Sequence, residues 1–319
     1  MTRASFQMPL KMEVLARYAA SHFAPLSRFP TPREKGQLGK LRRHEHDAAK
    51  HARDGWDCME DFDDADDLPL AIPAATLVVF RRDPAGGAAQ VLLLERSGAM
   101  RFAGGATVFP GGRIDRADYE LAERVRSDLD LDDAAARVAA IRETLEESGL
   151  AIGLVGNVTA ETAATARRML IEQGTLAPVL EAFGWQLALD RLTPFARWLP
   201  KHRAPRVFDT RFYIADLGTG AVDVAVDATE NTHLFWASAR EALRLAEAGE
   251  IQVIFPTRRN LERLAQFDDF AACLEHARAT PVVTITPSVA VRDGARWLTI
   301  PEDAGYPVHG EPIESAMRG

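Results

Sequence analysis

Arg-Glu-Thr-Leu-Glu-Glu-Ser-Gly-Leu, at residues 142–150, closes an alanine-rich run that begins at Asp132. The run predicts a helix because alanine has the highest helix propensity, and Gly149 is the residue type that commonly follows a helix C-terminus. On helical geometry three carboxylates share one face, those of Glu143, Glu146 and Glu147. A second face is expected to pack inward through Val138, Ile141 and Leu145.

The charges at the end of this helix are unfavourable. Glutamates at this spacing repel, and carboxylates meet the negative end of the helix macrodipole, each at a cost of about a few tenths of a kcal/mol. Arg142 can neutralise Glu146, four residues further along, but the other two carboxylates remain uncompensated. The pattern is either a solvated acidic helix end or a group of carboxylates that binds a cation.

A second motif lies upstream at residues 109–115, which read Phe-Pro-Gly-Gly-Arg-Ile-Asp. It predicts the end of a strand that turns through two glycines. A glycine turn that brings a backbone carbonyl beside a carboxylate-lined helix forms an oxygen-rich site suited to a hard cation such as Mg²⁺. The two motifs together favour a cation site.

The composition is that of a globular protein with a full core. The chain has 319 residues, 47% of them hydrophobic, and its net charge of −8 argues against general nucleic-acid binding. The only cysteines are Cys58 and Cys273, which excludes a disulfide framework and indicates a reducing compartment. Neither a membrane helix of ~20 apolar residues nor an apolar signal core is present. We expect a cytoplasmic protein without membrane contact, although the basic residues 1–28 leave a transit peptide as a minority alternative.

Apolar periodicity predicts a mixed sheet flanked by helices. Runs at 75–81 and 90–95 are separated by Asp-Pro-Ala-Gly-Gly, which is typical of a hairpin. Further strands are expected at 107–109, 151–155, 195–199, 210–215, 233–237, 282–286 and 297–300. Helices are expected at 161–172, 179–189, 238–248, 257–264 and 267–277. Residues 1–70 indicate instead an arm, partly disordered or helical, to which we assign no chemistry.

The two motifs match the halves of a known box. The Nudix box runs Gly, five residues, Glu, seven residues and then Arg-Glu-U-x-Glu-Glu-x-Gly-U, where U is a bulky aliphatic. Here Gly112 matches the opening and residues 142–150 match the close, with Thr144 replacing the first aliphatic. The chain thus resembles the Nudix hydrolase superfamily. It departs in two ways, because Asp118 replaces the first glutamate and the gap before Arg142 is sixteen residues longer.

The substrate branch is indicated by the insertion and by a second signature. An insertion at this place is similar to that of the acyl-coenzyme A diphosphatases of the mammalian peroxisomal type. The coenzyme A branch also carries Leu-Leu-Thr-x-Arg-Ser, Arg, Gly and Phe-Pro-Gly-Gly, with three residues between successive parts. This chain reads Leu-Leu-Leu-Glu-Arg-Ser at 92–97, then Arg101, Gly105 and 109–112 at the same spacing, so that only Leu94 departs.

A diphosphate resists attack by water, and the residues suited to overcome this are oxygen ligands around a divalent ion, Mg²⁺ or Mn²⁺. We expect Glu146 and Glu147 to be the principal ligands, with Glu143 as a third ligand or as the base that activates water. The Gly112 carbonyl is expected to complete the shell. The expected catalytic residues are Glu143, Glu146 and Arg142.

Further residues are expected to orient the ligands and the substrate. Arg142 is expected to orient a glutamate by a charge-assisted hydrogen bond. The resemblance implies a further metal ligand from a downstream loop, where Glu230 stands at the expected position. Arg96 and Arg101 suit the substrate phosphates because a guanidinium fork matches phosphate geometry. Arg206, in a basic cluster with residues 201–203, suits the 3′-phosphate of coenzyme A, although an ordinary charged loop is the alternative for this cluster.

The resemblance implies an α/β fold of the α+β type, in which a Nudix-like mixed sheet lies between helices, with helical insertions and an N-terminal arm. We expect the arm at 1–70, the Nudix domain at 71–281 with its insertion at about 113–133, and a C-terminal extension at 282–319 that packs on the domain.

The implied function is divalent-metal-dependent hydrolysis of coenzyme A or acyl-CoA to 3′,5′-ADP and (acyl-)phosphopantetheine. Two alternatives stay open: a Nudix pyrophosphatase for NADH, nucleoside diphosphate sugars or dinucleotide polyphosphates, and a non-catalytic scaffold that binds a nucleotide. The expected partner is a small nucleotide-type molecule rather than nucleic acid or a membrane, and a homodimer is left open.

Overall fold

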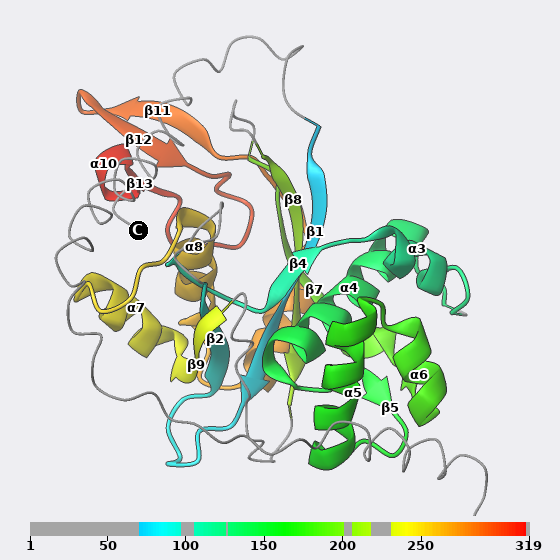
Figure 1. Cartoon of the computed structure of the whole chain (residues 1–319). Coiled ribbons are helices and arrows are strands. Elements are labelled where there is room, and N and C mark those ends of the chain that lie inside the picture. The colour runs from blue at the N-terminus through cyan, green and yellow to red at the C-terminus, as the bar shows by residue number, and fades with distance from the viewer. Residues whose placement is uncertain (1–69, 97–104, 126, 201–205, 218–230, 317–319) are drawn as a thin grey trace, which may run out of the picture. The chain divides into compact units, whose positions relative to one another are not determined.

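The computed structural model describes residues 70–96, 105–125, 127–200, 206–217 and 231–316 (Figure 1). All of them belong to one compact unit, Ala52–Gly319. Its main sheet follows the order β10-β7-β8-β1-β2-β3, with β4 paired to β1 and β9 paired to β2. These strands are β1 (Ile72–Arg81), β2 (Gln90–Arg96), β3 (Thr107–Val108), β4 (Gly111–Arg113), β7 (Thr193–Trp198), β8 (Phe208–Asp216), β9 (Asn231–Ser238) and β10 (Thr284–Ile285).

The central strand β1 is apolar and buried on both faces. It runs parallel to β8, from the pair Ile72 and Phe208 to the pair Phe80 and Asp216, and antiparallel to β2 and β4. Strands covered on both sides read as continuous apolar runs because both sets of alternating side chains must be buried. The sheet is therefore mixed, as predicted.

Alternation along the strands divides the core into two hydrophobic clusters. Leu77 and Leu92 belong to the cluster that packs against α4 (Leu131–Ser148), α5 (Ala160–Gln173) and α6 (Ala177–Phe183). Val78 and Leu93 point to the other cluster, which includes residues of α7 (Ala239–Glu247), α8 (Phe255–Leu264) and α9 (Phe270–Ala279). Figure 1 shows α4 to α6 and α7 to α8 on opposite sides of the strands. The predicted α/β class, a mixed sheet between helices, is confirmed.

The C-terminal residues complete the second cluster. A small antiparallel sheet is formed by β11 (Ser288–Arg292), β12 (Ala295–Thr299) and β13 (Gly310–Pro312), followed by α10 (Ile313–Ala316). Leu298, Ile300 and Tyr306 are buried in the cluster that also holds Leu261 of α8. None of the helices in the described part of the chain is long and apolar enough to cross a membrane.

Helix α4 is held onto the sheet at its N-terminal end. Its cap residue Asp130 accepts a hydrogen bond from the backbone N–H of Asp133 (2.9 Å). The Asp133 carboxylate accepts a hydrogen bond from Tyr213 of β8 (2.6 Å) and pairs with Arg137 (2.7 Å). Since Val138, Ile141 and Leu145 are fully buried, as predicted, the direction and rotation of α4 are both determined.

Three sequence-based expectations about elements were wrong. The two glycines at 111 and 112 form strand β4 rather than a turn. The helix expected at 179–189 ends at Phe183, because Gly184 adopts a left-handed conformation (φ 63°), and β6 (Gln186–Leu187) and a 3₁₀ turn at Leu189–Arg191 follow. The strand expected at 151–155 is reduced to β5 (Leu154–Val155), which pairs with β6. The insertion contains α3 (Arg116–Ala122), in agreement with the helical insertions that the resemblance implied, although no bounds had been predicted for it.

Candidate active site

Strand β4 brings the glycine pair against the sheet and the end of α4. Gly111 pairs with Thr76 of β1 so closely that a Cβ there would lie 2.7 Å from the Cα of Thr76. At Gly112 a Cβ would overlap the carboxylate of Glu143. Both positions therefore require glycine for close approach, one to a backbone and the other to a candidate ligand.

Arg142 connects the two halves of the motif. Its Nε donates to Asp118 Oδ1 (2.9 Å), its Nη2 donates to Asp118 Oδ2 (3.0 Å) and to the backbone carbonyl of Arg113 (2.9 Å), and its Nη1 donates to Glu143 Oε1 (2.9 Å). Glu146 lies 3.5 Å from the same Nη1. The side chains of Arg142 and Asp118 are 5% and 2% exposed, so this pair is desolvated.

The pKa of Arg142 reflects the balance of these contacts. Burial lowers the pKa, but hydrogen bonds to Asp118 and the charge of Glu143 outweigh it, so the pKa lies above the usual arginine range. The guanidinium is therefore a permanent cation among the acids.

Glu147 reaches the glycine pair from the other direction. Its side chain is buried, and its Oε2 accepts a hydrogen bond from the backbone N–H of Gly111 (2.9 Å). Two carboxylates of α4 thus flank the dipeptide, Glu147 at Gly111 and Glu143 at Gly112, while Glu146 is more exposed at 30%.

These residues are hard oxygen donors of the kind that Mg²⁺ prefers, and Gly112 leaves the space that the Glu143 carboxylate occupies. Within the described ranges, no three His, Cys, Asp or Glu side chains are already gathered closely enough to hold a metal ion. The donor set therefore fits a divalent cation chemically, with one expected ligand, Glu230, outside the described residues.

The other predicted site residues are more widely distributed. Arg101 and residues 201–203 lie outside the described residues, as Glu230 does. Arg96 ends β2, and its buried Nε has no hydrogen-bond partner in the part of the chain that the structure describes. Arg206 is exposed just before β8. Thus the structure brings together Gly112, Arg142, Glu143, Glu146 and Glu147, but does not place Arg206 with them.

Arg167 of α5 was missed by sequence reasoning. Its Nε donates to the backbone carbonyl of Glu146 (2.7 Å) and its Nη2 to that of Glu147 (3.3 Å). No local sequence signal could have identified it, because an arginine on a separate helix has no fixed spacing to the motif.

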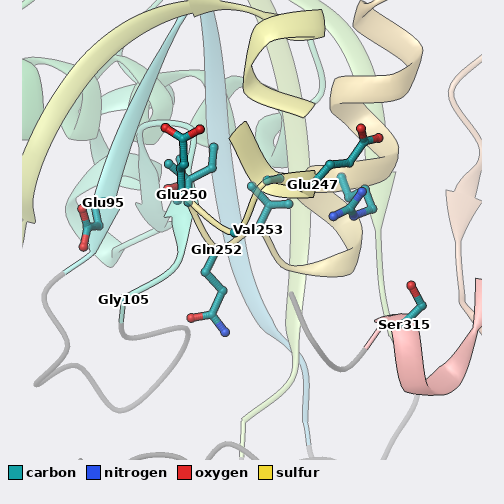
Figure 2. A pocket seen from close by; sticks show the side chains of 12 residues that line it. Glu95, Gly105, Glu247, Glu250, Gln252, Val253 and Ser315 are labelled. Carbon is teal, nitrogen blue, oxygen red and sulfur yellow. The ribbon is translucent and has the colours of Figure 1, made fainter. Parts of the chain in front are cut away.

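The face of the sheet opposite α4 holds an aromatic core and a separate cavity. Trp198 and Phe212 are buried on the face opposite α4, and Trp198 donates to the hydroxyl of Tyr306 (3.1 Å). On that face a cavity of about 750 Å³ is lined by residues that include Glu95, Glu247 and Arg258 (Figure 2). The glutamates of α4 do not line it.

Comparison with known proteins shows what this chain resembles in sequence and in fold. No family model matches the chain. Nudix hydrolase 7 of Caenorhabditis elegans is 24% identical over 218 residues, which cover 68% of this chain and 70% of that protein. An acyl-coenzyme A diphosphatase of Gallus gallus is 27% identical over 234 residues, covering 56% of this chain and 61% of that protein. The crystal structure of a Nudix hydrolase from Alicyclobacillus acidocaldarius superposes with a TM-score of 0.57 at 28% identity, over 66% of this chain and 97% of that one.

The chain is a homologue of the Nudix hydrolases. Nudix hydrolases act on phosphorus-containing anhydrides and generally use divalent metal ions. In this chain the halves of the Nudix box, although separated by the long insertion, meet through Asp118 and Arg142. The insertion therefore does not separate the two halves of the box in space, because α3 within it supplies Asp118 to the buried pair with Arg142.

Proposed function

We propose that this chain hydrolyses the diphosphate linkage of coenzyme A or acyl-CoA, with Mg²⁺ or Mn²⁺, to give 3′,5′-ADP and (acyl-)phosphopantetheine. The observation that carries the proposal is the convergence of Glu143 and Glu147 on the Gly111–Gly112 pair. This pair ends the coenzyme A signature and opens the Nudix box, so the same dipeptide joins the substrate motif to the acids.

The residues that would hold the ion are those already predicted. Glu146 and Glu147 are the proposed principal ligands, with the Gly112 carbonyl, Glu143 and Glu230 as further donors. A divalent cation bound there would neutralise charge on the diphosphate and lower the pKa of a coordinated water.

The protein's own contribution is orientation and proton transfer. Arg142 directs Glu143 through its Nη1 donor, and Asp118 holds Arg142 in place. Glu143 is suited to accept the proton of the attacking water because its carboxylate lies beside Gly112. Arg142 is thus expected to act through Glu143.

The substrate assignment is supported by three features. The signature at residues 92–112 is similar to that of the coenzyme A branch, and one relative is named an acyl-coenzyme A diphosphatase. The buried Nε of Arg96 has no protein partner among the described residues, so it retains a donor for a phosphate oxygen. Arg101 and Arg206 remain predicted phosphate contacts.

Mass spectrometry of the products tests the proposal. The protein is incubated with coenzyme A, acyl-CoA, NADH, a nucleoside diphosphate sugar and a dinucleotide polyphosphate, each with Mg²⁺ or Mn²⁺. We expect 3′,5′-ADP from coenzyme A or acyl-CoA as the preferred product. Preferred turnover of another substrate would overturn the coenzyme A assignment, and nucleotide binding without any product would indicate a scaffold.

A further inference from the structure

The last turn of α4 carries two of the proposed metal ligands and ends in backbone carbonyls that α4 itself does not satisfy. The last four carbonyls of any helix lack partners within the helix or are only partly satisfied by a cap. In α4 the carbonyl of Leu145 accepts from the N–H of Gly149 (2.9 Å). The next two carbonyls, of Glu146 and Glu147, accept from Arg167 of α5.

The contact is specific to one arginine and one point on α4. Arg167 is half-buried, and its Cδ lies 3.5 Å from the position that a Cβ on Gly149 would occupy, so the side chain crosses the helix end closely. Its neighbour Arg168 is exposed and donates to Thr165 within α5 (3.1 Å). Only the first of the two adjacent arginines therefore reaches α4.

The charge of Arg167 also suits its place. A cation at a helix C-terminus meets the negative end of the macrodipole. Here it also offsets the repulsion between Glu143, Glu146 and Glu147, which lie three and four residues apart. Each carbonyl that Arg167 binds belongs to a residue whose side chain is a proposed ligand. Losing Arg167 would leave both carbonyls to water and would release the turn that determines where those side chains point.

We propose that Arg167 is a positioning residue for the site, which holds the Glu146 and Glu147 carboxylates in place by fixing their backbone. This inference rests on the proposed function, because it assigns Arg167 to the same metal site. It extends the site beyond the Nudix box to α5, an element that the box does not include.

The fold should survive the loss of Arg167 because α4 has other contacts at this end. Gly149 closes the helix in the left-handed conformation (φ 77°), Ser148 donates to the carbonyl of Thr144 (2.6 Å), and Leu145 is fully buried. The substitution R167Q therefore tests position rather than folding, and R168Q on the same helix is its matched control.

The test measures Mn²⁺ binding by electron paramagnetic resonance and hydrogen exchange of residues 145–150 in the full chain. For R167Q we expect Mn²⁺ affinity to fall by about fivefold to tenfold and exchange at the end of α4 to rise, because two charge-assisted hydrogen bonds are lost. R167K, which retains the charge but not the planar fork, should lie between wild type and R167Q. R168Q should match wild type in both measurements.

The direction of the change separates positioning from simple electrostatics. Removing a positive charge near a cation site should strengthen Mn²⁺ binding if Arg167 acts only through its charge. Tighter or unchanged binding by R167Q would overturn the inference.

Both measurements are independent of substrate, so a wild-type protein that binds Mn²⁺ but cleaves no coenzyme A would contradict the proposed substrate alone. A wild-type protein that binds no Mn²⁺ would overturn both the metal site and the role of Arg167.

Discussion

At the scale of single residues, the buried pair of Asp118 and Arg142 explains how the chain tolerates an aspartate in place of the first glutamate of the box. Asp118 sits in the first turn of α3 and accepts from the backbone N–H of Asp115 (2.9 Å) as well as from Arg142. The short side chain suffices because α3 itself lies against α4 and carries the carboxylate to the guanidinium.

Replacing Asp118 with asparagine should destabilise the protein by up to about 3 kcal/mol, because the buried guanidinium loses the most deeply buried of its carboxylate partners. D115N is the control, since Asp115 is half-exposed and lies 3.7 Å from Arg142. Its cost should stay within about 1 kcal/mol. Urea unfolding of both variants measures the difference, and equal free energies of unfolding would show that the pair contributes nothing of its own.

Replacing Glu146 with glutamine should reduce kcat by several orders of magnitude while leaving the thermal unfolding midpoint nearly unchanged. Glu146 is a proposed ligand, and its side chain is 30% exposed, so the neutral amide is tolerated sterically. E181Q, on the exposed surface of α6, is the matched control. A normal rate for E146Q would mean that the site has been assigned to the wrong residues.

At the scale of elements, β4 is the link between the sheet and the end of α4. It is only three residues long, yet it pairs with β1 and receives contacts from both Glu143 and Glu147. Its two glycines serve different purposes, because the missing Cβ atoms face different neighbours. Gly111 faces the backbone of β1, and Gly112 faces a carboxylate that can move.

Alanine substitutions at these two positions should therefore separate stability from activity. G111A should destabilise the fold by about 1–3 kcal/mol, because its Cβ would collide with the backbone of Thr76. G112A should displace the Glu143 side chain and lower kcat at least tenfold with a smaller loss of stability. Guanidinium unfolding and steady-state kinetics on both variants test the contrast, and the reverse pattern would contradict it.

At the scale of the whole molecule, the region after α9 is joined to α8 through buried charges. Arg259 of α8 pairs with Glu262 (2.8 Å) and lies 3.6 Å from Glu311 of β13. Burial raises the pKa of Glu262 to about 7, and the positive charge of Arg259 only partly opposes this shift. Two carboxylates face one guanidinium here, so the cluster favours an additional proton.

This cluster should make stability depend on pH. The pKa of Glu262 in the folded protein lies above that of an ordinary glutamate (4.5), so between about pH 4.5 and 7 the folded state holds a proton that the unfolded state has lost. The contribution of this group to stability is thus present at acidic pH and is lost as the pH rises through 7. Comparing wild type with E262Q by urea unfolding at pH 5.5 and pH 8, we expect the variant to lose less stability at pH 8, by about 1–3 kcal/mol. An identical pH dependence would contradict the role of Glu262.

Local patterns in the sequence were sufficient for α4, the central strands β1 and β2 and the spacing of the acids of the box. Val138, Ile141 and Leu145 repeat with the period of a helix, and a spacing of three and four residues places the glutamates on one side whatever surrounds them. The sequence shows that Asp118 replaces the first glutamate of the box and that it stands sixteen residues further from Arg142 than in the standard box. It does not show that the two side chains form a buried ion pair.

Contacts between distant segments were decided only by the tertiary structure. The sequence by itself determined which residues form the acidic end of α4, because this depends on spacing within one element, and the motif shared by the two segments indicated that a glycine pair belongs with it. Packing decided that the glycines form a strand, that Asp118 meets Arg142 across 24 residues, and that Arg167 caps the helix from α5. Such contacts depend on how helices and strands pack over the sheet, and periodicity along the chain carries no information about that arrangement.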